Sequence, residues 1–229
     1  MAVPAGPPPD DPGATAPTPS TDRGGAPPAG DTGVPEVSEA AAEQGLAAPD
    51  ALVEAVRSIE TNEALDAPAA TLETIATKVA PEGPVHDALL GTWLGHALHP
   101  LMTDLPIGMW TSATLLDLVG GRRSRPAAKR LVGAGIITAL PTAATGLAEW
   151  LHVDRASRRV GVVHAGSNTV GLALYVLSYM ARRKGHHLRG AALALLGGAA
   201  ATAGGYLGGH LAIARKDGTR DDRFAEPAG

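Results

Sequence analysis

Four long apolar runs fill most of the chain after residue 100 and limit what it can fold into. They cover residues 101–119, 131–151, 160–181 and 191–214, so each holds about 19 to 24 residues. A helix needs roughly 20 residues to cross the hydrocarbon core of a bilayer. Soluble helices would carry a charged outer face, and these runs have none. The sequence therefore predicts an all-α fold, a four-helix up-and-down transmembrane bundle at residues 91–229, in a multi-pass protein of the cell membrane.

The segment before the bundle has a different character. Residues 1–48 are rich in proline, alanine and glycine, a composition that cannot bury enough apolar surface to fold, so we expect a disordered, acidic tail. Residues 49–90 repeat apolar side chains at steps of three and four, which predicts two short amphipathic helices separated near Asp66 to Pro68. We expect these helices to pack on the rest of the protein or on a partner.

Charge is distributed unevenly along the chain. Residues 1–87 contain three Lys and Arg against fifteen Asp and Glu, whereas residues 88–229 contain sixteen against eight. The basic residues of the second part cluster between the apolar runs, as in the loops of a membrane protein, and form no basic face with interleaved aromatic residues. A lipid bilayer is therefore the predicted partner, and nucleic acid is not. The chain has no cysteine, which excludes a thiolate metal site or an iron–sulfur cluster held by this chain alone.

Glycine is dense in the fourth run, where small residues permit close packing of helices in lipid. At 100° per residue, Gly198, Gly205 and Gly209 fall on one side of the helix, and Gly204 with Gly208 forms a second pair of small residues four positions apart. We expect this run to be the central packing helix.

Ionisable side chains gather at one predicted membrane surface. In an up-and-down bundle, the start of the first span, the end of the second, the start of the third and the end of the fourth lie at the same surface. The residues at these positions are His96, His99, Asp104, Glu149, His164 and His210. The opposite surface receives the basic residues of the first and third loops.

Such residues inside a membrane bundle indicate a functional site by default. We identify His96, His99, His164 and His210 as candidate ligands of a transition metal or of a haem iron. Asp104 and Glu149 are candidates for further metal ligands, or for groups that orient the imidazoles. The alternative interpretation is structural: the first two histidines cap the helix entry, His164 bonds to Glu149 across helices, and His210 ends the last span.

Three segments, GTWLGHALHPLMTDLPIGMW, RRVGVVHAGSNTVGLALY and GGYLGGHLA, together resemble a bacterial membrane family, domain of unknown function 2231 (DUF2231). The resemblance extends from Ile59 to Phe224, and the composition is similar to that of high-GC actinobacterial proteins. Members of the family are often joined to a C-terminal Rieske [2Fe-2S] domain, which implies an association with electron transfer. Because this chain has no cysteine, a Rieske or other redox partner is expected on a separate polypeptide.

Several functions remain open at this stage. The leading hypothesis is a redox-associated membrane protein with a His and carboxylate site for a metal or haem. A non-catalytic scaffold or assembly subunit, which could self-associate as a homo-oligomer, is the alternative, and a small transporter is the third. No hydrolytic triad or phosphate-binding loop is evident, so the sequence leaves open whether the protein is an enzyme.

Overall fold

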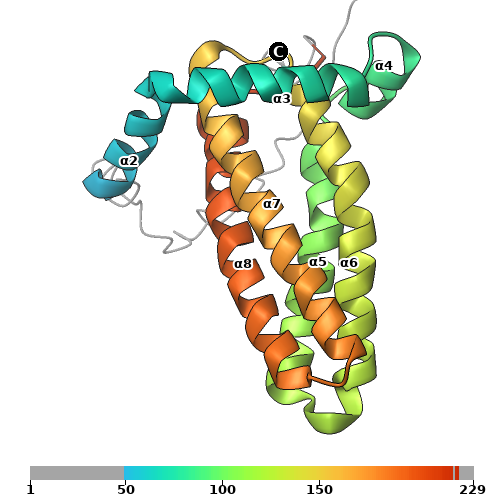
Figure 1. Cartoon of the computed structure of the whole chain (residues 1–229). Coiled ribbons are helices and arrows are strands. Elements are labelled where there is room, and N and C mark those ends of the chain that lie inside the picture. The colour runs from blue at the N-terminus through green and yellow to red at the C-terminus, as the bar shows by residue number, and fades with distance from the viewer. Residues whose placement is uncertain (1–48, 219, 222–229) are drawn as a thin grey trace, which may run out of the picture. The chain divides into compact units, whose positions relative to one another are not determined.

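A computed structural model describes residues 49–218 and 220–221, and the predicted disordered tail, residues 1–48, lies outside this part of the chain. The described residues are mainly helical (Figure 1), which confirms the all-α class. In chain order the helices are α2 (Asp50–Thr61), α3 (Asp66–Val79), α4 (Pro84–Leu90), α5 (His99–Val119), α6 (Gly121–Trp150), α7 (Arg155–Arg183) and α8 (His187–Gly209). A π-helix, His210–Ala214, continues α8, and 3₁₀ turns lie at Glu63–Leu65 and Thr92–Leu94.

The four apolar runs form α5 to α8. Among the described residues, three helices are long and apolar enough to cross a membrane: α6, α7, and α8 together with its π-helical continuation. Helix α5, which contains Asp104, Asp117 and an internal Pro106, is not one of these three. Helix α5 packs on α6 and α8, and α7 packs on the same two helices.

Two of the helices are longer than their apolar runs. Helix α6 begins at Gly121 instead of residue 131, and α7 begins at Arg155 instead of residue 160. The basic segments between the runs are therefore largely helical, because Arg, Lys and Ala are good helix formers. The polypeptide reverses direction in short turns at Gly120 and around Lys184 to Gly185, as shown in Figure 1.

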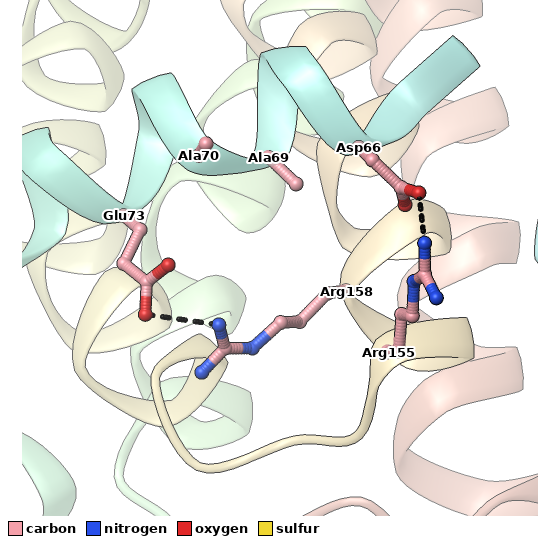
Figure 2. A pocket seen from close by; sticks show the side chains of 6 residues that line it. All are labelled: Asp66, Ala69, Ala70, Glu73, Arg155 and Arg158. Carbon is pink, nitrogen blue, oxygen red and sulfur yellow. Dashed lines mark hydrogen bonds and ion pairs between the residues drawn. The ribbon is translucent and has the colours of Figure 1, made fainter. Parts of the chain in front are cut away.

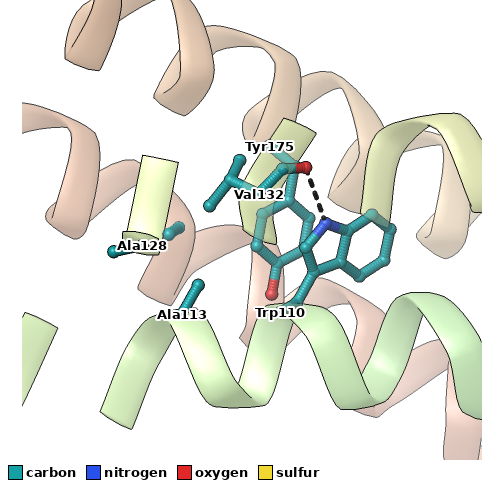
Figure 3. Close-up of a cluster of buried hydrophobic side chains, with 6 residues drawn as sticks. Trp110, Ala113, Ala128, Val132 and Tyr175 are labelled. Carbon is teal, nitrogen blue, oxygen red and sulfur yellow. Dashed lines mark hydrogen bonds between the residues drawn. The ribbon is translucent and has the colours of Figure 1, made fainter. Parts of the chain in front are cut away.

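An aromatic pair lies at the centre of the packing between α5, α6 and α7. The rings of Trp110 and Tyr175 stack with their centroids 3.9 Å apart and their planes 10° apart. The Trp110 indole N–H donates to the carbonyl of Val132 at 3.4 Å, as shown in Figure 3. Gly135 leaves room for this indole, because a Cβ at that position would be only 2.3 Å from the indole nitrogen. Small buried residues, Ala113, Ala128 and Ala194, complete the cluster.

Close contact between α7 and α8 depends on glycines, and only one of the two glycine sets seen in the sequence lies in it. A Cβ at Gly197 would lie 3.2 Å from the Gly171 carbonyl, and a Cβ at Gly204 would lie 2.7 Å from the Asn168 side chain. Gly205 and Gly209 instead face open space. Of the two glycine sets seen in the sequence, the pair of Gly204 and Gly208 therefore lies on the contact face. This face is offset from Gly205 and Gly209 by one residue, or about 100° around the helix.

A buried ion pair joins α5 to α7. The Arg182 guanidinium donates to both carboxylate oxygens of Asp117, with an Nη1–Oδ1 distance of 2.8 Å, and its Nε donates to the hydroxyl of Ser178 at 3.1 Å. The Arg182 side chain is fully buried and that of Asp117 is 13% exposed. Each charge is therefore matched where water is largely excluded, which is the condition under which a buried ion pair is tolerated.

The helices before α5 pack on the ends of α6 and α7. Helix α2 contacts α7, α3 contacts both α6 and α7, and α4 contacts α6. The break between α2 and α3 lies at Asn62, whose side chain accepts a hydrogen bond from the Ala64 amide, and α3 already begins at Asp66. Pro68 falls in the first turn of α3, where a missing N–H costs no helical hydrogen bond.

Candidate histidine site

His99 begins α5 and reaches across to α6. The turn before it requires left-handed backbone at Gly91 and Gly95, with φ of 83° and 78°. The His99 Nδ1 lies 3.0 Å from the carbonyl oxygen of Thr142 and 3.2 Å from the hydroxyl of Thr145. A carbonyl oxygen can only accept, so this imidazole nitrogen carries the hydrogen. The ring lies against Gly146, where a Cβ would be 2.8 Å from its Cε1 atom.

His164 is held in a similar way between α7 and α8. Its Nδ1 lies 2.7 Å from the carbonyl oxygen of Gly204 and therefore also carries the hydrogen. The ring occupies space left by Gly208, where a Cβ would be 2.9 Å from the Cε1 atom. The Asn168 side-chain amide lies 3.2 Å from Nε2 and donates to it. His164 therefore bonds to α8 and to its own helix.

The two imidazoles, His99 and His164, are neighbours; we refer to them as the histidine pair. Their ring centroids are 6.3 Å apart and their planes are nearly perpendicular, at 84°. In both rings Nδ1 donates to a backbone carbonyl, which fixes the tautomer and leaves Nε2 as the acceptor nitrogen, occupied in His164 by the Asn168 amide. This is the arrangement that metal-binding imidazoles commonly have, with one nitrogen oriented by the protein and the other presented to the metal.

The other four predicted site residues do not complete a metal-holding group with the pair in the part of the chain that the structure describes. His210 lies 3.0 Å from a carboxylate oxygen of Glu60 on α2. His96 is exposed, and its backbone forms an isolated bridge with Arg220. Asp104 is exposed, and Glu149 is buried on α6. Within residues 49–218 and 220–221, no group of three or more His, Asp or Glu side chains could hold a metal ion.

A second histidine contact was missed from the sequence. His86 on α4 and His152, which follows α6, have their Nε2 atoms 2.7 Å apart, and the His86 Nδ1 lies 3.1 Å from the Ala80 carbonyl oxygen. Because Nδ1 of His86 donates to that carbonyl, its Nε2 accepts from His152. The contact joins α4 to the end of α6. His152 directly follows the second apolar run, so the reasoning that selected Glu149 would have selected it too.

The acidic helices α2 and α3 are paired with basic residues at the start of α7. Asp66 accepts from Arg155 at 2.5 Å and from Arg159 at 2.8 Å, and Glu73 accepts from Arg158 at 2.9 Å. The contacts of Asp66 with Arg155 and of Glu73 with Arg158 are shown in Figure 2. Glu60 on α2 contacts both His210 and Arg215. The expectation that these helices pack on the rest of the protein is therefore confirmed.

We expect low pH to weaken the contact between α3 and the start of α7. Hydrogen bonds from the Arg159 and Arg155 guanidinium groups hold the pKa of Asp66 well below its ordinary value of 3.8. A lowered carboxyl pKa stabilises the folded state above the ordinary value, and this stabilisation is lost as the pH falls below it. The protection factors of the α3 amides, which compare measured exchange with the intrinsic rate at each pH, should therefore fall as the pH is lowered from about 5. Most of this fall should lie below pH 3.8.

The variant Asp66→Asn provides the check. It should exchange faster than the wild type at neutral pH and should lose the part of the pH response that belongs to this carboxyl group. An unchanged pH response in the variant would contradict the assignment to Asp66. The exposed Asp50→Asn on α2, which has no ion pair within the described residues, is the matched control.

Comparison with known proteins identifies one family. The model of the family described as Predicted membrane protein (DUF2231) matches residues 95–220, more than half of the chain. The matched segment contains α5 to α8 and both members of the histidine pair. The predicted resemblance is confirmed over this segment. No curated protein and no solved structure matches the chain.

Proposed function

The chain belongs to the DUF2231 family of predicted membrane proteins, and we propose that the histidine pair binds a transition-metal ion within a four-helix, multi-pass bundle of the cell membrane. In this proposal α5 crosses the bilayer together with α6, α7 and α8. His99 and His164 are the ligands, and the bound metal gives the protein a redox-associated role.

The surface of α5 supports its place among the spans. The helix is 21 residues long, which is sufficient for the hydrocarbon core. Six of its large apolar side chains are exposed, namely Leu101, Leu105, Ile107, Leu115, Leu118 and Val119. A soluble protein rarely exposes so many large apolar side chains on one helix, whereas lipid would cover them. The α5 contacts with α6 and α8 support its inclusion in the bundle.

The separation of the imidazoles is the observation that carries the metal proposal. A metal–nitrogen bond is roughly 2 Å long, and the ring centroid lies about 1 Å beyond the nitrogen. Two imidazoles on opposite sides of one ion therefore have centroids roughly 6 Å apart, close to the 6.3 Å between His99 and His164. Asn168 donates to Nε2 of His164 in this structure, so metal binding requires this amide to move aside.

Copper is the metal that this site favours. Two nitrogen ligands without a carboxylate give a weak site, so the ion with the highest intrinsic affinity for imidazole has the advantage. In the Irving–Williams order that ion is copper. Copper also changes its oxidation state by one electron, as a redox-associated role requires. The Rieske domains in related proteins support a separate Rieske or other redox protein as the electron partner.

Metal content of the purified, full-length protein tests the proposal. We expect about one copper ion per chain, and we expect His99→Ala and His164→Ala each to weaken binding by more than the roughly 10- to 100-fold that loss of an orienting partner costs. His96→Ala and His210→Ala are matched controls and should bind copper as the wild type does. Equal losses in all four variants, or no copper above background in the wild type, would overturn the proposal. A haem absorbance band lost only in the first two variants would assign haem to the same pair.

The scaffold alternative receives less support from the N-terminal helices. Their carboxylates at Glu60, Asp66 and Glu73 are engaged with residues of this chain, and are thus less available to a partner. The open face of α8 at Gly205 and Gly209 is where close packing of a second copy would be easiest. A stable complex that persists after replacement of both His99 and His164 would favour the scaffold function.

A further inference from the structure

A cationic pocket lies at the opposite ends of α6 and α7 from the helices α2 and α3. It has a volume of about 490 Å³ and is lined by Arg122, Arg125, Pro126, Lys129, Arg182, Arg183, Gly185 and His187. These residues come from the first turns of α6, the end of α7 and the start of α8, three elements that meet at one end of the structure in Figure 1. We call it the cationic pocket. It shares no residue with the histidine pair.

Acidic side chains neutralise only a small part of the positive charge in this pocket. Arg182 is neutralised by Asp117. The other four cationic side chains form no ion pair with any acidic residue that the structure describes. Two of these four, Arg125 and Lys129, are only partly exposed. Asp117 is the only acidic residue between positions 105 and 148, and none lies between 155 and 216. An unmatched charge that is partly withdrawn from water is costly, and a bound anion would offset this cost.

The backbone at the pocket adds to the positive potential. Helices α6 and α8 both begin here, and neither has an acidic residue in its first turn or a side chain that caps its N-terminus. The positive end of a helix dipole and its free N–H groups attract anions. Arg122, Arg125 and Lys129 increase this potential, although cations near a helix N-terminus are locally unfavourable. The Nδ1 atom of His187 is buried and has no hydrogen-bond partner within the described part of the chain.

We propose that the cationic pocket binds a phosphate group. Several Arg and Lys side chains around free helix N-termini are the usual protein ligands of phosphate, and basic pockets between membrane helices bind phospholipid headgroups. The neighbouring residues Leu118, Val119 and Leu188 are 68%, 83% and 82% exposed. These apolar side chains would contact acyl chains, so an anionic phospholipid is the source that the surface favours over soluble phosphate.

Two triple variants of the full-length protein test this proposal. Arg122→Gln, Arg125→Gln and Lys129→Gln together neutralise the pocket. Arg123→Gln, Arg130→Gln and Lys184→Gln together remove the same charge from the start of α6 and the end of α7, but none of these residues lines the pocket. The probes are phosphatidylglycerol and phosphatidylcholine in mixed detergent micelles, and sodium phosphate against sodium chloride at equal ionic strength. Dissociation constants are measured by fluorescence titration, and circular dichroism checks that each variant is folded.

The wild type should bind phosphatidylglycerol at least roughly tenfold more tightly than phosphatidylcholine, since each basic residue near a membrane surface contributes about this order of preference. The pocket variant should lose this preference and the control variant should keep it. If inorganic phosphate binds the wild type and not the pocket variant, and competes with the lipid, the phosphate group is recognised independently of the acyl chains. Equal losses in the two variants, or no preference for either phosphate probe in the wild type, would overturn the proposal. If the triple pocket variant does not fold, the single variant Lys129→Gln replaces it. We expect this single variant to lose part of the preference for phosphatidylglycerol.

Discussion

Replacing Asp117 with alanine is expected to lower the free energy of unfolding by about 3–5 kcal/mol, because it leaves a buried guanidinium without its counter-charge. The Arg182 side chain is fully buried, and both carboxylate oxygens of Asp117 accept from it. Without that carboxylate, the Ser178 hydroxyl is the only hydrogen-bond partner that the Arg182 guanidinium retains among the described residues. Denaturation of the purified protein in detergent, followed by circular dichroism, measures the change.

Two further variants separate the ion pair from other effects. Asp104→Ala removes a carboxylate from the same helix at an exposed position and should change stability by no more than about 0.5 kcal/mol. The double variant Asp117→Leu, Arg182→Met removes both charges and should recover most of the loss, because apolar replacement of a whole buried pair is often neutral. If the double variant is as unstable as Asp117→Ala, the loss does not come from an unpaired charge.

Replacing Trp110 with alanine is the second large effect, with an expected loss of about 3–5 kcal/mol. The indole is 8% exposed, stacks on Tyr175, and fills the space above Gly135. Its removal leaves a cavity between α5, α6 and α7, and closely packed helices close such a cavity only in part. Tyr175 also loses its stacking partner, which contributes about 0.5–1.5 kcal/mol beyond area burial.

Trp93→Ala is the matched control for this change. The Trp93 side chain is 67% exposed and lies in the turn before α5, so the same substitution there should alter stability only slightly. Thermal unfolding of both variants in the same detergent gives the comparison. Similar losses at the two positions would mean that the Trp110 cluster does not hold α5 against α6 and α7.

The local sequence was sufficient to predict the helical class of the protein. It predicted the histidine pair only in part. The lengths of the apolar runs indicate helices directly, because each helix forms its backbone hydrogen bonds within its own segment. The alternation of helix directions then placed His99 and His164 at one surface and the two basic loops at the other. That argument does not specify rotation about each helix axis. It therefore could not separate His164, which contacts His99, from His210, which contacts Glu60.

The same limit explains why the sequence left the packing glycines of α8 open. Gly204 and Gly205 differ by one position, and both are followed by a glycine four residues later. Gly204 with Gly208 and Gly205 with Gly209 are thus identical in residue type and spacing. Only the packing against α7 distinguishes the two pairs. The structure places Gly204 against Asn168 and Gly208 against His164, whereas Gly205 and Gly209 face open space. The glycines of the packed pair are thus also the ones that leave room for the candidate ligand.

By itself, the sequence determined the helical class, the family, and the placement of His99 and His164 at the end opposite to the first and third basic loops, since these depend on apolar length, local motifs and chain direction. Only the tertiary structure decided which side chains meet. It paired His99 with His164, joined Asp117 to Arg182, engaged the acidic α2 and α3 with α7, and placed Arg125 and Lys129 along one pocket. These contacts join residues from different helices, and their formation depends on helix rotation and on the space that glycines leave between helices.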